Sequence, residues 1–198
     1  MSISAPSSIN TARTSDCLRN HFLLSMPSLS EGIFAQSVTY ICEHGESGAM
    51  GIMINHALEL SVAEIFEHLK IRPRGNFTDR AVMAGGPVQI DHGFVLHRNC
   101  SSTWEASLKV TPEITLTTSC DILRAIANCN GPQDHLIALG YAGWAAGQLE
   151  QELAENSWLT LPADSDIIFA TPPEQRLEAA AALLGIDMNL ISAEAGHA

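Results

Sequence analysis

The chain has 198 residues, 46% hydrophobic and 16% charged, and a chain of this length buries enough surface to fold as one domain without a metal or a disulfide. Its formal net charge of −12 disfavours direct nucleic-acid binding, because phosphate backbones bind clustered Lys and Arg. No uninterrupted apolar run reaches the ~18 residues that a membrane helix needs, so we expect a soluble cytoplasmic protein with no membrane contact.

The N-terminal segment MSISAPSSINTARTSD lacks the charged stretch and apolar run of a secretory signal. We expect residues 1–20 to form a flexible tail and residues 21–198 to form a single domain. The five cysteines are odd in number and include no CxxC pair. This pattern indicates reduced thiols in a cytosol, and it predicts neither a disulfide framework nor a metal or other cofactor.

Apolar and β-branched runs predict the first three strands, at 22–24, 37–43 and 50–55. A short Gly-containing turn joins the last two runs, which favours an antiparallel hairpin. Ser61 then precedes Glu64 by three residues, the spacing of a capping box, and apolar residues follow at helical intervals. The sequence therefore predicts a hairpin followed by a helix that begins at Ser61.

The second half of the chain mixes both kinds of element. Strands and helices do not alternate regularly enough for a doubly wound sheet, so the predicted fold class is α+β. We expect a compact domain with a mixed, largely antiparallel sheet and about three main helices. The expected elements are strands at 80–86, 92–98, 107–110, 113–118, 136–142 and 167–170, and helices from Thr118 or Ser119, from about 148 and over 173–185.

Cys42 and His44 are two residues apart on a predicted strand, so both side chains are expected on one face of the sheet. They are candidates for a thiol and its base, although a buried Cys beside a strand-end His is the commoner arrangement. A nucleophilic thiol also needs electropositive surroundings, whereas Glu43 and Glu46 flank His44. No second pair stands at metal-ligand spacing, so no metal site is predicted.

Three glycines, Gly140, Gly143 and Gly147, lie between an apolar run and an acidic amphipathic segment. Their spacing matches neither a dinucleotide-binding loop nor a Walker sequence, no Lys follows, and the next segment carries several Glu residues. We therefore predict a sharp strand-to-helix joint at this point. Tyr141 and Trp144 are expected to be large core or rim aromatics.

A second glycine-rich turn stands at Gly85 and Gly86, immediately before Pro87. If the two glycine-rich turns lie together near Asn55 and His44, they line a cleft with aromatic walls and little charge, suited to a small ligand or a peptide. The candidate ligand-binding residues are therefore Asn55, Gly85, Gly86, Tyr141 and Trp144.

Several separate motifs in order resemble the AlgH/YqgE family of bacterial proteins. They are YICEHGESGAMGIMIN, GGPV with GFVLH, TTSCDIL, GYAGWAAGQLEQEL with NSWL, and the closing LGID with GHA. The resemblance covers the chain from about His21 onward. It implies a compact α+β domain with a branched, largely antiparallel sheet, in a family whose members are mostly uncharacterised and sometimes called transcriptional regulators.

The chain departs from that family pattern at three places. The family's Asn-Arg-Pro is Asn55-His56-Ala57, its Gly after Trp144 is Ala145, and its usual Asp and Trp near the last strand and helix are Ala170 and Leu177. We expect a non-enzymatic cytosolic regulatory or interaction protein that acts through a protein or small-molecule partner. The alternative is a thiol-based enzyme or redox sensor that uses Cys42 with His44.

Overall fold

The computed structural model describes residues 17–29 and 31–186. Within them the chain forms ten strands and five α-helices. The strands are β1 (His21–Ser25), β2 (Val38–Gly45), β3 (Gly48–Met53), β4 (Ala57–Ser61), β5 (Ala81–Ala84), β6 (Val88–Arg98), β7 (Ser107–Lys109), β8 (Ile114–Thr117), β9 (His135–Ala145) and β10 (Trp158–Pro162). The helices are α1 (Val62–His68), α2 (Cys120–Ala127), α3 (Gln148–Ala154), α4 (Ser165–Phe169) and α5 (Arg176–Leu183), with short 3-10 turns η1 (Pro27–Leu29) and η2 (Pro173–Gln175).

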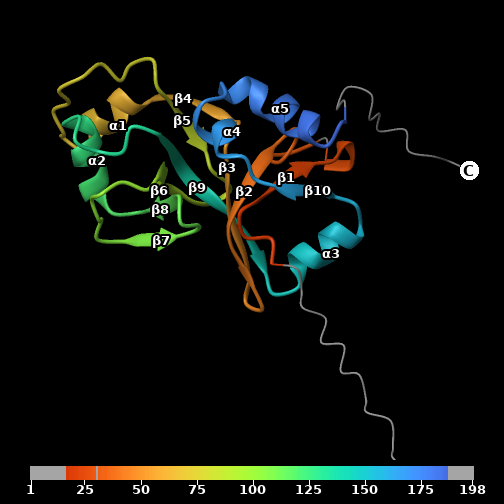
Figure 1. Ribbon diagram of the computed structural model, residues 1–198. Coiled ribbons are helices and arrows are strands. Elements are labelled where there is room, and N and C mark those ends of the chain that lie inside the picture. The colour runs from red at the N-terminus through yellow and green to blue at the C-terminus, as the bar shows by residue number, and fades with distance from the viewer. Residues whose placement is uncertain (1–16, 30, 187–198) are drawn as a thin grey trace, which may run out of the picture.

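The strands form one branched sheet in the order β10-β1-β2-β3-β9-β6-β8-β7. Strand β9 runs through the middle of the molecule and belongs to both halves (Figure 1). Its C-terminal part pairs with β3, and its N-terminal part pairs with β6. We call β10, β1, β2 and β3 the first arm, and β6, β8 and β7 the second arm. The α+β class is confirmed, but the sheet is larger and the helices are more numerous than the sequence predicted.

The branch depends on a large bulge where β6 meets β9. Val88 pairs with Tyr141 and Gly93 pairs with Leu139, so four residues of β6 lie opposite the single residue Gly140. Gly140 has a left-handed φ of 71°, a conformation that a glycine adopts at little cost. The surplus residues 89–92 loop outward and are exposed. A bulge of this kind bends a strand and ends regular pairing, which lets the two arms diverge here.

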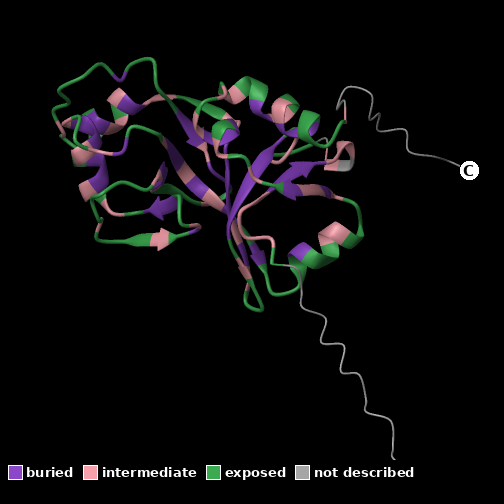
Figure 2. Ribbon diagram, in the orientation of Figure 1, coloured by how far each residue is buried: buried purple, intermediate pink, exposed green. Residues whose placement is uncertain are grey.

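Three apolar clusters hold the helices against the sheet, and buried residues concentrate on the central strands (Figure 2). In the first cluster, α4 and α5 pack on strands of both arms, with Phe22, Tyr40 and Leu96 fully buried. In the second, α1 and α2 cover the second arm around Phe66. In the third, α3 packs Leu149 against the first arm. Helices therefore cover the branched sheet at three places.

Local sequence signals account for most of the helix positions. The predicted capping box is present, because the backbone N–H of Ser61 donates to Glu64 Oε2 at 2.8 Å and the Ser61 hydroxyl accepts from the Glu64 N–H. The strand predicted at 167–170 is wrong, since these residues fall in α4 and in its C-cap. Asp164 explains the difference, because its carboxylate accepts from the N–H of Asp166 at 2.8 Å and caps the helix.

The ends of the chain lie partly outside the described residues. Residues 1–16 of the predicted tail are among those not described, as is the closing GHA motif. Residues 17–20 contact the domain: the N–H of Asn20 donates to the carbonyl of Ile41, and Leu18 packs on the third cluster. No helix in the described part of the chain is both long and apolar enough to span a membrane.

Two histidines, His97 and His135, pair across β6 and β9. Burial lowers the pKa of each below its ordinary value of 6.5. The unfolded chain therefore binds more protons than the folded chain just below pH 6.5. The contribution of these histidines to the free energy of unfolding is complete above this pH and is lost as the pH falls. We expect urea denaturation to show a decline of up to about 1.4 kcal/mol per pH unit for each histidine.

The variant His97→Gln isolates the contribution of the more buried histidine, of which 2% is exposed. Its unfolding free energy is expected to fall less between about pH 7.5 and about pH 5.5 than that of the unchanged chain. An equal fall in both proteins contradicts the assignment to His97.

Candidate functional site

A groove of about 730 Å³ lies in the angle between the two arms; we call it the inter-arm groove. One wall comes from the β2–β3 hairpin, the opposite wall from β7, β8 and the segment before them, and the remainder from β6 and β9. The lining residues are Glu43, Ser47, Gly48, Ala49, Met50, Val88, Gln89, Phe94, Ala106, Ser107, Leu108, Leu116, Thr118, Tyr141, Gly143 and Trp144.

Two aromatic residues of β9, Tyr141 and Trp144, belong to this lining. The Tyr141 ring meets Phe94 edge-on, with 5.6 Å between ring centroids. The Trp144 indole N–H donates to Glu152 Oε2 of α3 at 2.8 Å, and the indole of Trp158 donates to the same oxygen at 2.8 Å. The Trp144 ring therefore packs in the third cluster on the α3 side, and Tyr141 and Phe94 form the aromatic surface of the groove. Because their edge-on contact holds these two rings in place, the groove needs little reorganisation to accept a ligand.

The inter-arm groove is mostly apolar and carries little charge. Among its described lining residues, Glu43 is the one Asp, Glu, Lys or Arg. Its polar groups otherwise come from neutral side chains such as Ser107, Thr118 and Gln89. Gln89 stands in the β6 bulge with a φ of 50°, a left-handed value that is uncommon for a residue with a side chain. Strained residues of this kind cluster at ligand sites, which marks the bulge as part of the candidate site.

The prediction that Cys42 and His44 share one face of the sheet is wrong. The pairing of β2 with β3 shifts register between Ile41 and Glu43, so Cys42 is an extra residue in a bulge. Cys42 consequently points into the first cluster, whereas His44 pairs with Ala49 of the third cluster. One inserted residue reverses the alternation of side chains, which places the two on opposite faces.

The surroundings of the two side chains also differ. Cys42 is fully buried, and this burial raises the pKa of its thiol. His44 accepts a hydrogen bond at Nδ1 from the N–H of Leu18 at 3.0 Å, while its Nε2 lies 2.9 Å from Glu150 Oε1 of α3. Both ring nitrogens of His44 are thus engaged on the α3 side of the sheet.

Comparison with known proteins shows the family of this chain. A family model described as AlgH-like matches residues 22–189. The chain belongs to the AlgH-like family. It is 55% identical over 181 residues to a UPF0301 protein of Saccharophagus degradans, covering 91% of this chain and 89% of that protein. It is 54% identical over 179 residues to a UPF0301 protein of Thioalkalivibrio sulfidiphilus, covering 90% and 96%.

Solved structures agree with this assignment. The solution structure of the AlgH protein from Pseudomonas aeruginosa is 47% identical, covers 100% of both chains and superposes with a TM-score of 0.77. A crystal structure of protein DIP2367 from Corynebacterium diphtheriae shares 18% identity over 88% of this chain and 91% of that one, with a TM-score of 0.70. The second likeness, at this low identity, shows the common fold alone.

The remaining candidate residues of this AlgH-like chain are distributed over the branch of the sheet. Asn55 fastens the loop before β2, because its Oδ1 accepts from the N–H of Val38 at 2.7 Å and its Nδ2 donates to the carbonyl of Gln36 at 2.8 Å. Gly85 and Gly86 pack against the backbone of β9. Of the five predicted ligand-binding residues, the structure places Tyr141 and Trp144 in the groove lining and does not place Asn55, Gly85 or Gly86 there.

Sequence reasoning missed most of the groove. Met50 and Leu108 come from segments far apart in the chain, and neither stands in a motif that predicts a site. The uneven run from Val88 to Gly93 could have indicated a bulge, since polar and apolar residues there fail to alternate. Within the described residues, no group of three or more His, Cys, Asp or Glu side chains could hold a metal ion.

Proposed function

We propose that this AlgH-like chain is a non-enzymatic cytosolic regulatory or interaction protein that binds its ligand in the inter-arm groove. The supporting observation is the combination of a groove of about 730 Å³, a mostly apolar lining and the edge-on aromatic pair of Tyr141 and Phe94. Small-molecule and peptide sites generally have these properties. A catalytic role for Cys42 with His44 gains no support, because the two side chains lie on opposite faces of the sheet.

The ligand that fits this lining is an apolar body with one cationic group. Glu43 supplies a carboxylate at the groove wall, and no Lys or Arg is among the described lining residues. The whole chain carries a net charge of −12, which also attracts cationic partners over distance. A basic side chain of a peptide and a small organic amine provide the same chemistry. The acidic surface disfavours nucleic acid, so a role in transcription would operate through such a partner.

A thermal-shift screen with aryl and alkyl amines tests this proposal, with the matching alcohols and carboxylates as comparison compounds. Amines are expected to raise Tm more than their neutral or anionic analogues. Glu43→Gln should weaken amine binding about two- to fivefold, the size of an exposed charge pair. Ala106 is exposed at the groove, so Ala106→Trp should fill part of the groove and remove most of the shift.

The matched control is Ala182→Trp, which introduces the same side chain at an exposed position of α5 outside the groove lining. It should leave the amine-induced shift unchanged. Equal shifts in the Ala106 and Ala182 variants would refute binding in the inter-arm groove. Stronger shifts with carboxylates than with amines would refute the proposed ligand charge.

A further inference from the structure

A second hollow, of about 210 Å³, shares no lining residue with the inter-arm groove. It lies between β5, the start of α1, the first residues of β9 and the segment that begins α5, and we call it the arginine pocket. The residues that line it are Val62, Asp79, Arg80, Ala81, Met83, His135, Leu136, Ile137, Pro173 and Arg176. It combines two arginines with one carboxylate, in a chain that has 22 acidic and ten basic residues.

Arg176 is a buried cation held by neutral groups. Only 7% of it is exposed. Its Nε donates to the carbonyl of Thr171 at 2.9 Å, and its Nη1 donates to the carbonyl of Ile54 and lies 3.9 Å from the sulfur of Met83. Burial lowers its pKa to about 10, so the guanidinium remains charged at neutral pH.

No ion pair among the described residues involves Arg176. Its Nη2 also forms no hydrogen bond within that part of the chain. Taking a charge out of water costs several kcal/mol unless an opposite charge compensates it. An uncompensated guanidinium that lines a hollow is therefore a reason to look for an anionic ligand.

Arg80 is fixed on another side of the same pocket. Its Nη1 lies 3.1 Å from Nε2 of His135, and its guanidinium carbon stands 5.7 Å from the ring centroid of Phe77. His135 donates through Nδ1 to the carbonyl of Pro132 at 2.8 Å, which leaves Nε2 as the acceptor for Arg80. Burial lowers the pKa of His135, in keeping with a neutral ring. Arg80 is thus oriented without losing its positive charge.

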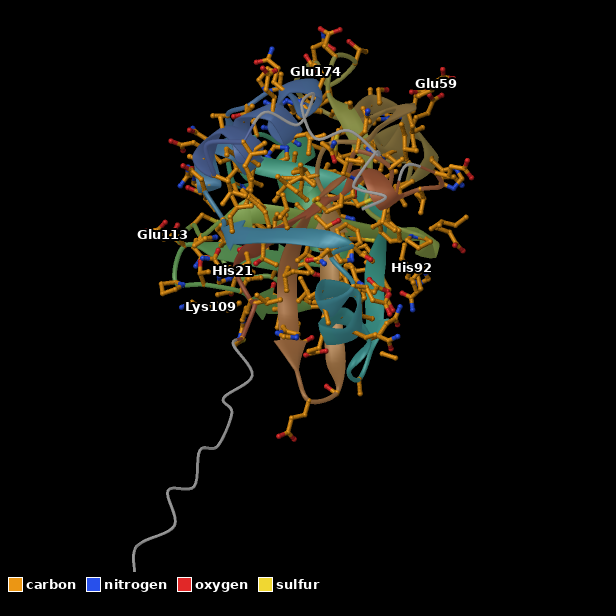
Figure 3. The ribbon with its side chains drawn as sticks, turned by 90° about the vertical axis from the view of Figure 1, so that its right-hand side faces the viewer. His21, Glu59, His92, Lys109, Glu113 and Glu174 are labelled. Atoms are coloured by element: carbon orange, nitrogen blue, oxygen red, sulfur yellow. The ribbon has the colours of Figure 1, made fainter. Side chains whose placement is uncertain are left out.

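The acidic neighbours do not neutralise these arginines. Asp79 lines the pocket, but it forms no ion pair with Arg80 or Arg176 among the described residues. Glu174 influences Arg176 through its charge, and it lies at the periphery beside the segment that leads into α5 (Figure 3). No hydrogen bond joins Glu174 to Arg176 in the described chain. The pocket therefore retains donor groups and positive charge that an added anion can use.

We propose that the arginine pocket binds the oxyanion group, a carboxylate or a phosphate, of a small molecule, with Arg80 and Arg176 as its donors. Guanidinium groups suit this task, because their planar N–H groups match the oxygens of both anions. The volume of about 210 Å³, roughly that of seven water molecules, accommodates the anionic group and a few neighbouring atoms of the molecule that carries it. His135 and Phe77 act as positioning residues for Arg80.

Amide NMR titrations with inorganic phosphate and with acetate, at ionic strength held constant with chloride, test this proposal. At least one probe is expected to cause saturable shifts at Arg80, Met83 and Ile137. The probe with the lower Kd identifies phosphate or carboxylate as the preferred group. Titrations in which neither probe saturates, or in which shifts fail to include the pocket, overturn the proposal.

Single variants separate ligand binding from support of the fold. Arg80 is exposed, so Arg80→Gln should fold normally and weaken binding about tenfold or more, as expected for loss of a charged hydrogen bond. Asp79→Asn should tighten binding about two- to fivefold because a repelling carboxylate is removed. Arg72→Gln, outside the pocket lining, is the charge-matched control and should bind like the unchanged chain. Unaltered binding in Arg80→Gln, or weaker binding in Asp79→Asn, refutes the site.

Discussion

Replacing Gly86 by alanine is expected to lower the free energy of unfolding by more than about 3 kcal/mol, the range of severe steric substitutions. A Cβ atom on Gly86 would stand 2.1 Å from the carbonyl carbon of Tyr141 and 2.3 Å from the backbone nitrogen of Ala142. Its φ of 153° adds backbone strain for any residue with a side chain. The clash involves the backbone of β9, which both arms share. Moving this backbone to relieve the clash would disturb the branch of the sheet. Urea denaturation followed by circular dichroism measures the loss.

The same substitution at Gly93 provides the control. Gly93 lies in β6, seven residues after Gly86, and apart from its chain neighbours no heavy atom stands within 4 Å of the position that its Cβ would take. Gly93→Ala is therefore expected to change stability by less than about 1 kcal/mol. If both variants lose the same free energy, close packing of Gly86 on β9 does not explain its presence.

The thiol of Cys42 is expected to react with iodoacetamide at least roughly 10³-fold more slowly than an exposed thiol of the folded chain, because its exposure requires opening of the core. Cys42 is fully buried in the first cluster, and its sulfur lies 3.7 Å from the carbonyl of Tyr40. Burial raises the pKa of this thiol, which further lowers the thiolate fraction. Peptide mass spectrometry after timed alkylation measures each cysteine separately.

The other cysteines serve as internal controls. Cys17, Cys100, Cys120 and Cys129 are exposed and should be alkylated quickly in the same sample. Modification of Cys42 should accelerate when urea unfolds the chain. Rapid modification in the native state, at the rate of Cys100, would contradict a structural role and revive the proposal of a reactive thiol.

The sequence predicted those helices and turns that neighbouring residues in the chain determine. The hairpin of β2 and β3 and the helix capped by Ser61 are confirmed, as is the strand-to-helix joint after β9. Cys42 and His44 show the limit of that reasoning. The alternation of a regular strand puts Cys42 and His44 on one face, but a one-residue bulge, which depends on the pairing partner, reverses it.

The candidate site was less accessible to sequence reasoning for a related reason. Tyr141 and Trp144 stand in a recognisable motif, and both belong to the groove lining. Met50 and Leu108 come from different arms of the sheet, and only the branch at β9 brings them to one groove. Arg80 and Arg176 likewise line one pocket only because of long-range packing. Periodicity and capping carry no information on such contacts.

The most direct test of the central proposal is amide NMR mapping of an aryl amine that raises Tm. Binding in the inter-arm groove predicts that the largest shifts occur at Met50, Leu108 and Gly143, from both arms and from β9. These shifts should disappear in Ala106→Trp and persist in Ala182→Trp. Shifts that cluster instead on α4 and α5, with the groove residues unmoved, would contradict the proposal that this groove is the ligand site.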